Sequence, residues 1–168
     1  IYNSYLNSFK NEVGSVNWLP VCSDAHGLVV NRDLFVQYGI LLPTDYAGFV
    51  AACKAFEEVG IRGYTADYLY DYTCMETLQG LSAGELTTIA GRKWRTAYSD
   101  PASNTRVGLD STVWPDGFER MEQFIQDTGL TAADLELNYD DVTGMFGNGQ
   151  LAMYFGSSAG VGLFQEQG

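Results

Sequence analysis

The sequence is poor in positive charge. It contains nine Lys and Arg residues against 21 Asp and Glu residues, which gives a formal net charge of −12. Proteins bind nucleic acids, and anionic membrane surfaces, mainly through clustered basic side chains. This composition therefore excludes nucleic acid as a partner and argues equally against attachment to an anionic membrane surface.

Cysteine and histidine are also scarce. The three cysteines, Cys22, Cys53 and Cys74, lack zinc-ligand spacing, and their odd number does not make a complete disulfide framework. Reduced thiols are favoured, although one disulfide with one free thiol stays open. The only histidine, His26, follows Asp24 and Cys22 in a Cys-x-Asp-x-His run. On an extended segment the three side chains project to one side, which predicts a pocket rim rather than a metal centre. No cofactor is expected.

Long apolar runs are absent, and no stretch reaches the roughly 20 residues needed to cross a bilayer. Hydrophobic residues still make up 46% of the 168 residues, which is enough for the core of one domain or one large lobe. Tyrosine is abundant, with 11 residues, and its ring and hydroxyl together suit neutral polyhydroxy ligands. Because the chain starts abruptly at Ile1 and stops at Gly168 within a helix-like segment, we expect an excised piece of a longer protein.

Apolar periodicity and turn residues predict alternating strands and helices, which favours an α/β layer fold. We expect helices over residues 1–12, 32–38, 45–60, 72–82, 113–128 and 138–146, and strands over residues 27–31, 61–65 and 151–155. Residues 13–21 indicate a turn and then a short strand that ends at Pro20. The strand at 27–31 reads as buried, and residues 84–112 give no clear pattern apart from a surface loop at 99–104. The expected caps are Gly39, Thr44 or Asp45, and Asn138 or Asp140. Helix starts also explain the acids Asp134, Glu136, Asp140 and Asp141 better than a calcium site does.

The most informative stretch runs from Phe146 to Ser158. We expect a short helix to close at Gly147 and Gly149, and an apolar strand to follow. The chain should then turn at Gly156 and open another helix at the two serines. Such a corner presents backbone N–H groups and hydroxyls to whatever lies above the strand, and so predicts a site for a polar ligand.

The same letters permit a catalytic alternative. Residues 156–160 match G-x-S-x-G between a strand and a helix, which is the nucleophile-elbow context of an α/β-hydrolase with Ser158 as nucleophile. That fold places its histidine after the serine, whereas His26 lies far upstream. The glycines Gly147 and Gly149 precede the strand, so the dinucleotide-binding fingerprint is not met. A truncated hydrolase and a non-catalytic surface adhesion module remain the alternative readings.

Several motifs together resemble the extracellular solute-binding proteins of carbohydrate-type ABC importers, which have the type II periplasmic-binding-protein fold. The run Asn31-Arg32-Asp33-Leu34-Phe35, with Gly39-Ile40 and Pro43, resembles N-K/R-D-L-F-x-x-x-G-[IL]-x-x-P. Phe146-x-x-Gly149-x-x-Ala152-Met153 resembles F-x-x-G-x-x-A-M, and Trp18-Leu19-Pro20 resembles a short strand that ends in Leu-Pro. The chain departs from the family in Gly48, which replaces a usual Glu, and after Gly156, where serines replace a usual aromatic residue.

The resemblance implies a mixed sheet flanked by helices, forming a single lobe of a two-lobe receptor. Residues 1–26 would form the crossover segment from the first lobe, and residues 27–168 the second lobe, incomplete at its C-terminus. It further implies binding of a sugar or oligosaccharide between the lobes, delivery to the transmembrane permease subunits, and no catalysis. The full-length protein would lie on the extracellular face of the membrane or in the periplasm, anchored by a lipid, and the missing first lobe would belong to the same chain.

In such a lobe the ligand is held by loops at the strand ends. We therefore expect ligand contacts from three segments, comprising Asp24 and His26, then Tyr70, Asp71 and Tyr72, and finally Gly156, Ser157 and Ser158. Asp24 and Asp71 would accept sugar hydroxyls, a tyrosine would stack on a ring, and the N–H groups of the corner would donate to ligand oxygens. The side chains that we expect in the core instead are those of Phe35, Phe49, Phe124 and Phe146.

Overall fold

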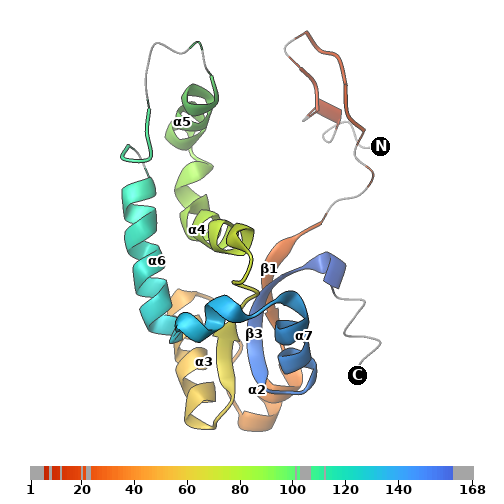
Figure 1. The fold of residues 1–168 in the computed structure, drawn as a ribbon, viewed down its shortest axis with the longest axis vertical. Helices are drawn as coiled ribbons and strands as arrows, with labels where there is room; N and C mark the ends of the chain where they lie inside the picture. Colours follow the sequence, from red (N-terminus) through yellow and green to blue (C-terminus); the bar gives the residue numbers. More distant parts are fainter. Residues whose placement is uncertain are drawn as a thin grey trace.

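The fold is organised around a three-stranded mixed sheet (Figure 1). The computed structural model describes residues 6–7, 9–11, 13–19, 21, 24–100, 102, 107–111 and 113–160. The strands are β1 (His26–Val30), β2 (Arg62–Thr65) and β3 (Leu151–Ser157), in the order β1-β3-β2. The central strand β3 pairs antiparallel with β1 and parallel with β2. The predicted α/β class with a mixed sheet and flanking helices is confirmed.

Helices make up most of the remaining described chain. They are α2 (Arg32–Tyr38), α3 (Tyr46–Glu58), α4 (Asp71–Leu86), α5 (Ile89–Ser99), α6 (Trp114–Thr128) and α7 (Tyr139–Gly147), with 3-10 turns η1 (Ala132–Glu136) and η2 (Ser158–Gly160). Helix α3 packs on β2, α7 packs on β3, and α4 packs on α6. Within the described ranges, none of these helices has the length and apolar character required to cross a membrane.

Local chemistry fixes most helix ends where the sequence predicts them. The Asp45 side chain accepts the Gly48 N–H at 2.7 Å, and Asn138 exchanges hydrogen bonds with Asp141 in a capping box. Helix α2 ends at Gly39, whose φ of 66° is a left-handed conformation that favours glycine. The caps predicted at Asp45, Asn138 and Gly39 are confirmed.

Aromatic side chains form the core between the sheet, α3 and α6. Phe35, Phe49 and Phe124 belong to this core, whereas Phe146 packs in a separate cluster of α7 and β3. All four are 2–8% exposed, so the prediction that they are buried is confirmed. The Phe49 ring stacks on Phe124 with 5.9 Å between centroids. Burial of each of these side chains contributes about 1.5–3 kcal/mol to the free energy of folding. This packing holds α3 and α6 against the sheet.

Arg62 and Asp134 tie β2 to the η1 turn. Arg62 Nη2 lies 2.9 Å from both carboxylate oxygens of Asp134, and the Thr65 hydroxyl donates to the same group at 2.8 Å. The N–H of Thr131 donates to Asp134 as well, at 2.7 Å. Burial by itself would raise the pKa of Asp134, but the Thr131 and Thr65 hydrogen bonds and the Arg62 charge outweigh it and lower the pKa. Asp134 is thus a structural acid.

Helices α4, α5 and α6 project away from the sheet (Figure 1). They enclose a cluster of their own that includes Leu78, Leu86, Trp94 and Trp114. Helix α5 is not predicted by the sequence, and α4 extends to Leu86 rather than ending at Ser82. Trp94 explains why α5 forms, because its ring packs on Trp114 and its indole N–H donates to Ser111 at 3.0 Å.

One prediction about the early chain is wrong, and a second is met only in part. Strand β1 lies at an edge of the sheet and is largely exposed, with Leu28 42% exposed, so it is not a buried strand. Of the turn and short strand predicted over 13–21, the described residues show the turn at Val13 and Gly14 and one bridge, between Lys10 and Val16, and Pro20 lies outside them. Most of the helix predicted over 1–12 lies outside as well. Cys53 and Cys74 are free thiols as predicted, whereas Cys22 lies outside the described residues.

Candidate functional site

The sheet topology brings three predicted segments together at one end of the strands. Because β2 and β3 are parallel, their carboxyl ends meet at this end, and the antiparallel β1 starts there. His26 pairs in register with Ser157. Ligands of open α/β sheets bind outside the carboxyl ends of the strands.

Asp24 joins the segment before β1 to the corner after β3. Its carboxylate accepts hydrogen bonds from the hydroxyls of Ser157 and Ser158, and from the N–H groups of Ala25 at 2.8 Å and Ala159 at 3.1 Å. The two hydroxyl bonds, chiefly that of Ser157, lower the pKa of Asp24 to about 2. The carboxylate oxygens are therefore already occupied by protein donors.

The corner differs from its predicted form. Strand β3 continues through Gly156 to Ser157, so the chain does not turn at Gly156, and the serines lead into the short η2 turn. The N–H of Ser158 donates to the Ala25 carbonyl at 2.8 Å, and the N–H of Ala159 donates to Asp24. These two N–H groups hold the chain together rather than point at an open site.

His26 lies between two carboxylates. Its Nδ1 is 3.3 Å from Glu76 Oε2, and its Nε2 is 3.6 Å from Asp24 Oδ2. Its ring also packs against Phe155, with 5.7 Å between ring centroids. A neutral imidazole has one N–H donor, whereas a protonated one donates from both nitrogens. This position links β1 to α4, because Glu76 lies in the second turn of that helix.

A cavity of about 130 Å³ opens beside His26 at the ends of β2 and β3. Its walls are predominantly aromatic, polar and acidic, and comprise His26, Asp67, Tyr72, Thr73, Glu76, Tyr139, Val142, Tyr154, Phe155, Gly156 and Ser157. Four residues predicted from the sequence are among them, namely His26, Tyr72, Gly156 and Ser157. Aromatic faces with a few convergent polar groups are typical of small-molecule sites.

The tyrosines after β2 divide between core and surface. Tyr68 is 5% exposed and its hydroxyl lies 3.1 Å from that of Tyr64, so it belongs to the core. Tyr70 and Tyr72 are 37% and 53% exposed, and their rings stack with 5.4 Å between centroids. This pair presents an exposed aromatic face beside the cavity. Asp71 begins α4 next to the pair but is not part of the cavity wall.

Asp67 supplies a second carboxylate to the cavity. The Thr73 hydroxyl donates to its Oδ1 at 3.0 Å. Burial raises the pKa of Asp67, and the charge of Glu76 raises it further, against the lowering effect of the Thr73 bond. The surroundings of Asp67 thus already disfavour negative charge.

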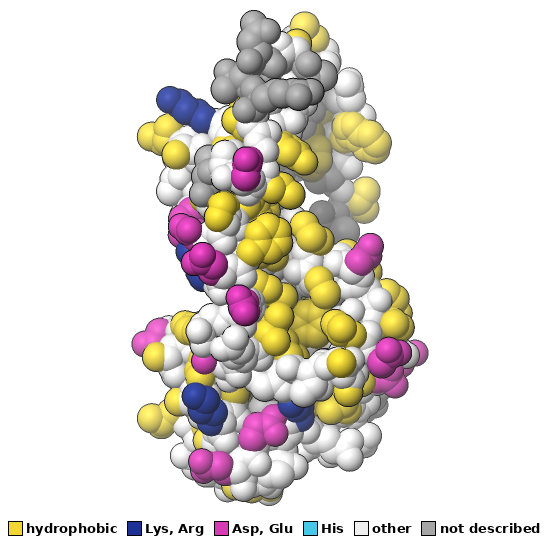
Figure 2. Space-filling model, turned by 60° about the vertical axis from the view of Figure 1, so that its left-hand side comes forward, with side chains coloured by type: hydrophobic (Ala, Val, Ile, Leu, Met, Phe, Trp, Pro, Cys, Tyr) yellow, Lys and Arg dark blue, Asp and Glu magenta, His cyan; other side chains and the backbone are white. Residues whose placement is uncertain are grey.

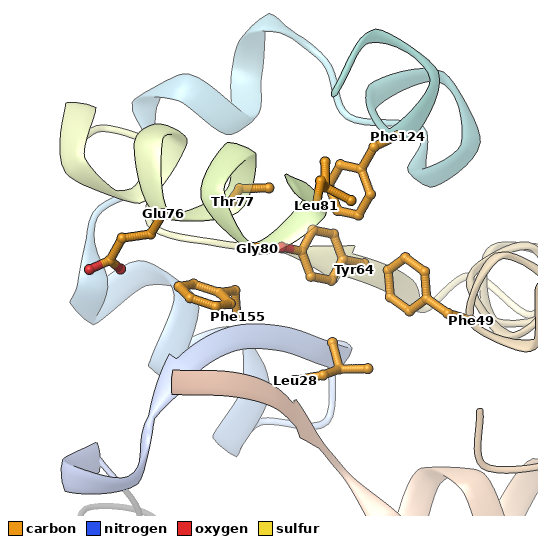
Figure 3. A pocket seen from close by; sticks show the side chains of 9 residues that line it. All are labelled: Leu28, Phe49, Tyr64, Glu76, Thr77, Gly80, Leu81, Phe124 and Phe155. Carbon is orange, nitrogen blue, oxygen red and sulfur yellow. The ribbon is translucent and has the colours of Figure 1, made fainter. Parts of the chain in front are cut away.

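A second hollow, of about 210 Å³, is apolar. It lies between α4 and the sheet, where the rings of Phe49, Tyr64 and Phe124 lie together (Figure 3). Glu76 stands at its border and points its carboxylate away from these rings (Figure 3). Hydrophobic side chains gather around a hollow on one face of the molecule, with acidic side chains near by (Figure 2). This hollow has almost no polar group with which to orient a polar ligand.

In the part of the chain that the structure describes, neither a metal-binding cluster nor the serine-histidine pair of the hydrolase alternative is formed. No group of three or more His, Cys, Asp or Glu side chains there could hold a metal ion. The Ser158 hydroxyl donates to Asp24, whereas nucleophilic catalysis requires a serine that donates to the imidazole of a base. The geometry therefore favours a binding site over the hydrolase alternative.

The structure adds Glu76 and Asp67 to the residues predicted from the sequence. Glu76 lies four residues after Tyr72, so helical periodicity puts both on one face of α4. That spacing could have identified Glu76 from the sequence. Asp67 follows β2 directly, at the strand end where ligand contacts are expected.

Comparison with known proteins identifies a family. The model of a family described as bacterial extracellular solute-binding protein matches residues 1–168. A search of curated proteins found no match.

Three solved structures illustrate the similarity of fold. One comes from a study of xylan utilization by the thermophilic bacterium Caldanaerobius polysaccharolyticus, with a TM-score of 0.76 at 19% identity over 95% of this chain and 38% of that chain. A chitin oligosaccharide binding protein gives a TM-score of 0.72 at 19% identity, over 95% of this chain and 38% of that one. A sugar transporter from Bacillus licheniformis, in complex with stachyose, gives 0.65 at 14% identity, over 90% of this chain and 39% of that one. The chain thus shares their fold but spans less than two-fifths of their length.

Proposed function

Because the chain belongs to the bacterial extracellular solute-binding proteins, we propose that it is one lobe of a two-lobe receptor for a sugar or an oligosaccharide. Residues 27–168 would form most of the second lobe, and residues 1–26 the crossover segment from the first. The ligand would lie between the lobes, and hinge closure would trap it and present it to the permease of an ABC importer. The full-length protein would lie on the extracellular face of the membrane or in the periplasm, held by a lipid anchor.

Two comparisons support this proposal. The similar structures include proteins whose descriptions mention xylan utilization, chitin oligosaccharide and stachyose. Each is more than twice as long as this chain, since the chain covers 38–39% of them. A first lobe of the same chain would account for part of that difference.

The observation that carries the proposal is the cavity at the carboxyl ends of β2 and β3. His26, Tyr72, Ser157 and Glu76 converge on it from β1, α4 and β3. The stacked rings of Tyr70 and Tyr72 offer a face to a pyranose ring, and the polar groups offer partners to its hydroxyls. This end of the sheet, at the carboxyl ends of β2 and β3, would form half of the ligand cleft.

We assign different roles to the predicted site residues. His26, Tyr72, Gly156 and Ser157 would border the ligand, together with Glu76. Asp24 would position the corner rather than bind sugar, because its oxygens are held by Ser157 and other protein donors. Tyr70 and Asp71 would line the outer rim of the cleft, and Ser158 would support Asp24.

The receptor would bind its ligand without chemical turnover. Ser158 donates to Asp24, and the ring nitrogens of His26 face carboxylates rather than the Ser158 hydroxyl. A serine-directed phosphonate should therefore leave Ser158 unlabelled. Labelling of Ser158 would instead support the hydrolase alternative.

Calorimetric titration of the full-length protein with xylotriose, chitotriose and stachyose tests the proposal. At least one neutral oligosaccharide should bind saturably. Replacing Tyr72 by Ala should weaken that binding about tenfold, because it removes a ring face worth about 1.4 kcal/mol. Tyr72→Phe keeps the ring and should retain most of the affinity.

Tyr98→Ala is the matched control, since Tyr98 is 56% exposed on α5 and takes no part in the cavity. Equal losses of affinity in Tyr72→Ala and Tyr98→Ala would show that the cavity is not the site. Binding to an insoluble polysaccharide or a protein, with no binding of soluble oligosaccharides, would favour the adhesion alternative.

A further inference from the structure

The ionisable groups around the cavity are almost all acidic. Asp67 and Glu76 line the cavity directly. Asp24 lies behind His26, with its Oδ2 3.6 Å from His26 Nε2. No Lys or Arg lines the cavity in the part of the chain that the structure describes. An anionic ligand would therefore enter a site with several negative charges.

His26 does not neutralise this charge for a ligand. Its two ring nitrogens face Glu76 at 3.3 Å and Asp24 at 3.6 Å, so both are directed at carboxylates of the protein. The single imidazole thus faces two carboxylates, those of Glu76 and Asp24. A ligand carboxylate would have to compete with Glu76 and Asp24 for the same N–H groups.

Arg62 and Arg120 form ion pairs away from the cavity. Arg62 pairs with Glu57 and Asp134 at the beginning of β2, which is the end of that strand away from the cavity. Arg120 pairs with Glu85 near the far end of α4. Neither guanidinium lines the cavity where a ligand would need it.

Asp67 lines the same cavity and is itself affected by the charge of Glu76. Burial raises its pKa, and the charge of Glu76 adds to that effect. The charge of Glu76 therefore disfavours a second negative charge at this end of the cavity.

On the basis of the proposed function, we propose that this cavity selects neutral or cationic saccharides and rejects saccharides that carry carboxylate or phosphate groups. Glu76 and Asp67 set this selectivity through charge. Hydroxyl and amino groups of a sugar can donate hydrogen bonds to carboxylates, whereas a carboxylate or a phosphate dianion cannot. Like charges brought together at a binding interface reduce affinity strongly.

The test compares one oligosaccharide backbone in three charge states. The neutral oligosaccharide that binds in the titration is compared with the same molecule carrying one uronic acid or one amino sugar, using the full-length protein. The uronic acid derivative should bind at least about tenfold more weakly, and the amino derivative should bind no more weakly than the neutral one. The rejection should diminish at higher ionic strength, because charge repulsion is screened by salt whereas a steric clash is not.

Glu76→Gln should reduce the ratio between the two dissociation constants, of the uronic and the neutral ligand, several-fold. Glu58→Gln is the matched control, since it removes a carboxylate at the end of α3, outside the cavity wall, and should leave that ratio unchanged. Equal affinity for the neutral and uronic ligands would overturn the inference while the proposed function stands. A salt-independent rejection of both derivatives would overturn it as well, by identifying a steric cause. Failure of every neutral oligosaccharide to bind would refute the proposed function, and the inference with it.

Discussion

Helix α3 lies so close to β2 that a single methyl group should destabilise the fold. Gly63 of β2 faces the backbone of Cys53, and a Cβ built on Gly63 would lie 2.6 Å from both the Cα and the carbonyl oxygen of Cys53. Both atoms belong to the helix backbone, so no side chain can rotate away. Gly63→Ala must therefore push α3 away from the strand that leads to the cavity.

Such overpacking typically costs 1–3 kcal/mol, and we expect about 3 kcal/mol here because the obstruction is backbone. In a protein of this size that loss lowers the melting temperature by roughly 6–12 °C. Urea unfolding followed by circular dichroism would measure the change in the free energy of unfolding. Gly84→Ala is the matched control, since its Cβ would meet nothing within 4 Å in the last turn of α4. That variant should gain about 0.5–1 kcal/mol, because Ala favours a helix more than Gly does.

The opposite signs of these two effects make the comparison decisive. If Gly63→Ala unfolded at the same urea concentration as the unmodified protein, the close approach of α3 to β2 would be refuted. A gain of stability in Gly63→Ala would have the same meaning.

Three further predictions concern individual side chains. Asp134→Asn should cost about 3 kcal/mol in urea unfolding, because it breaks the largely buried pair with Arg62, and an unchanged midpoint would contradict that role. The Asp24 pKa of about 2 lies below its usual value of 3.8, so its hydrogen bonds stabilise the corner above about pH 4 and are lost as the pH falls toward 2. The chemical shift of the Ala159 N–H, which donates to Asp24, should accordingly titrate near pH 2 in NMR spectra rather than near pH 4. Cys53, which is 1% exposed and whose pKa burial raises to about 12, should stay unmodified by iodoacetamide at pH 8 until the protein unfolds, as mass spectrometry would establish.

Local chemistry explains how much of the fold could be predicted. Asp45, Asn138 and Gly39 cap helices through bonds that span a few residues, so the sequence alone indicates them. Helix α5 was within reach of sequence reasoning in part, because its residues are amphipathic and the Thr88 hydroxyl caps it locally by accepting the Gly91 N–H at 3.1 Å. Its formation depends on Trp94 packing against Trp114, which lies 20 positions further along the chain.

The candidate site could be predicted in part. The β3 corner and the Tyr72 segment were expected at one edge, since strand ends indicate where an α/β sheet binds ligands. The role of Asp24 could not be predicted, because its partners Ser157 and Ser158 lie more than 130 positions away. The same distance explains why the N–H groups of the corner seemed free in the sequence but are engaged in the structure. Glu76 was within reach of sequence reasoning, since it lies one helical turn after Tyr72.

Parallel calorimetric titrations of the full-length protein and of residues 1–168 alone would test most directly whether this lobe forms half of a saccharide cleft. We expect the full-length protein to bind a neutral oligosaccharide saturably, and the isolated lobe to bind it at least about a hundredfold more weakly, because half of the contacts are missing. Equally tight binding by the isolated lobe would contradict the two-lobe receptor.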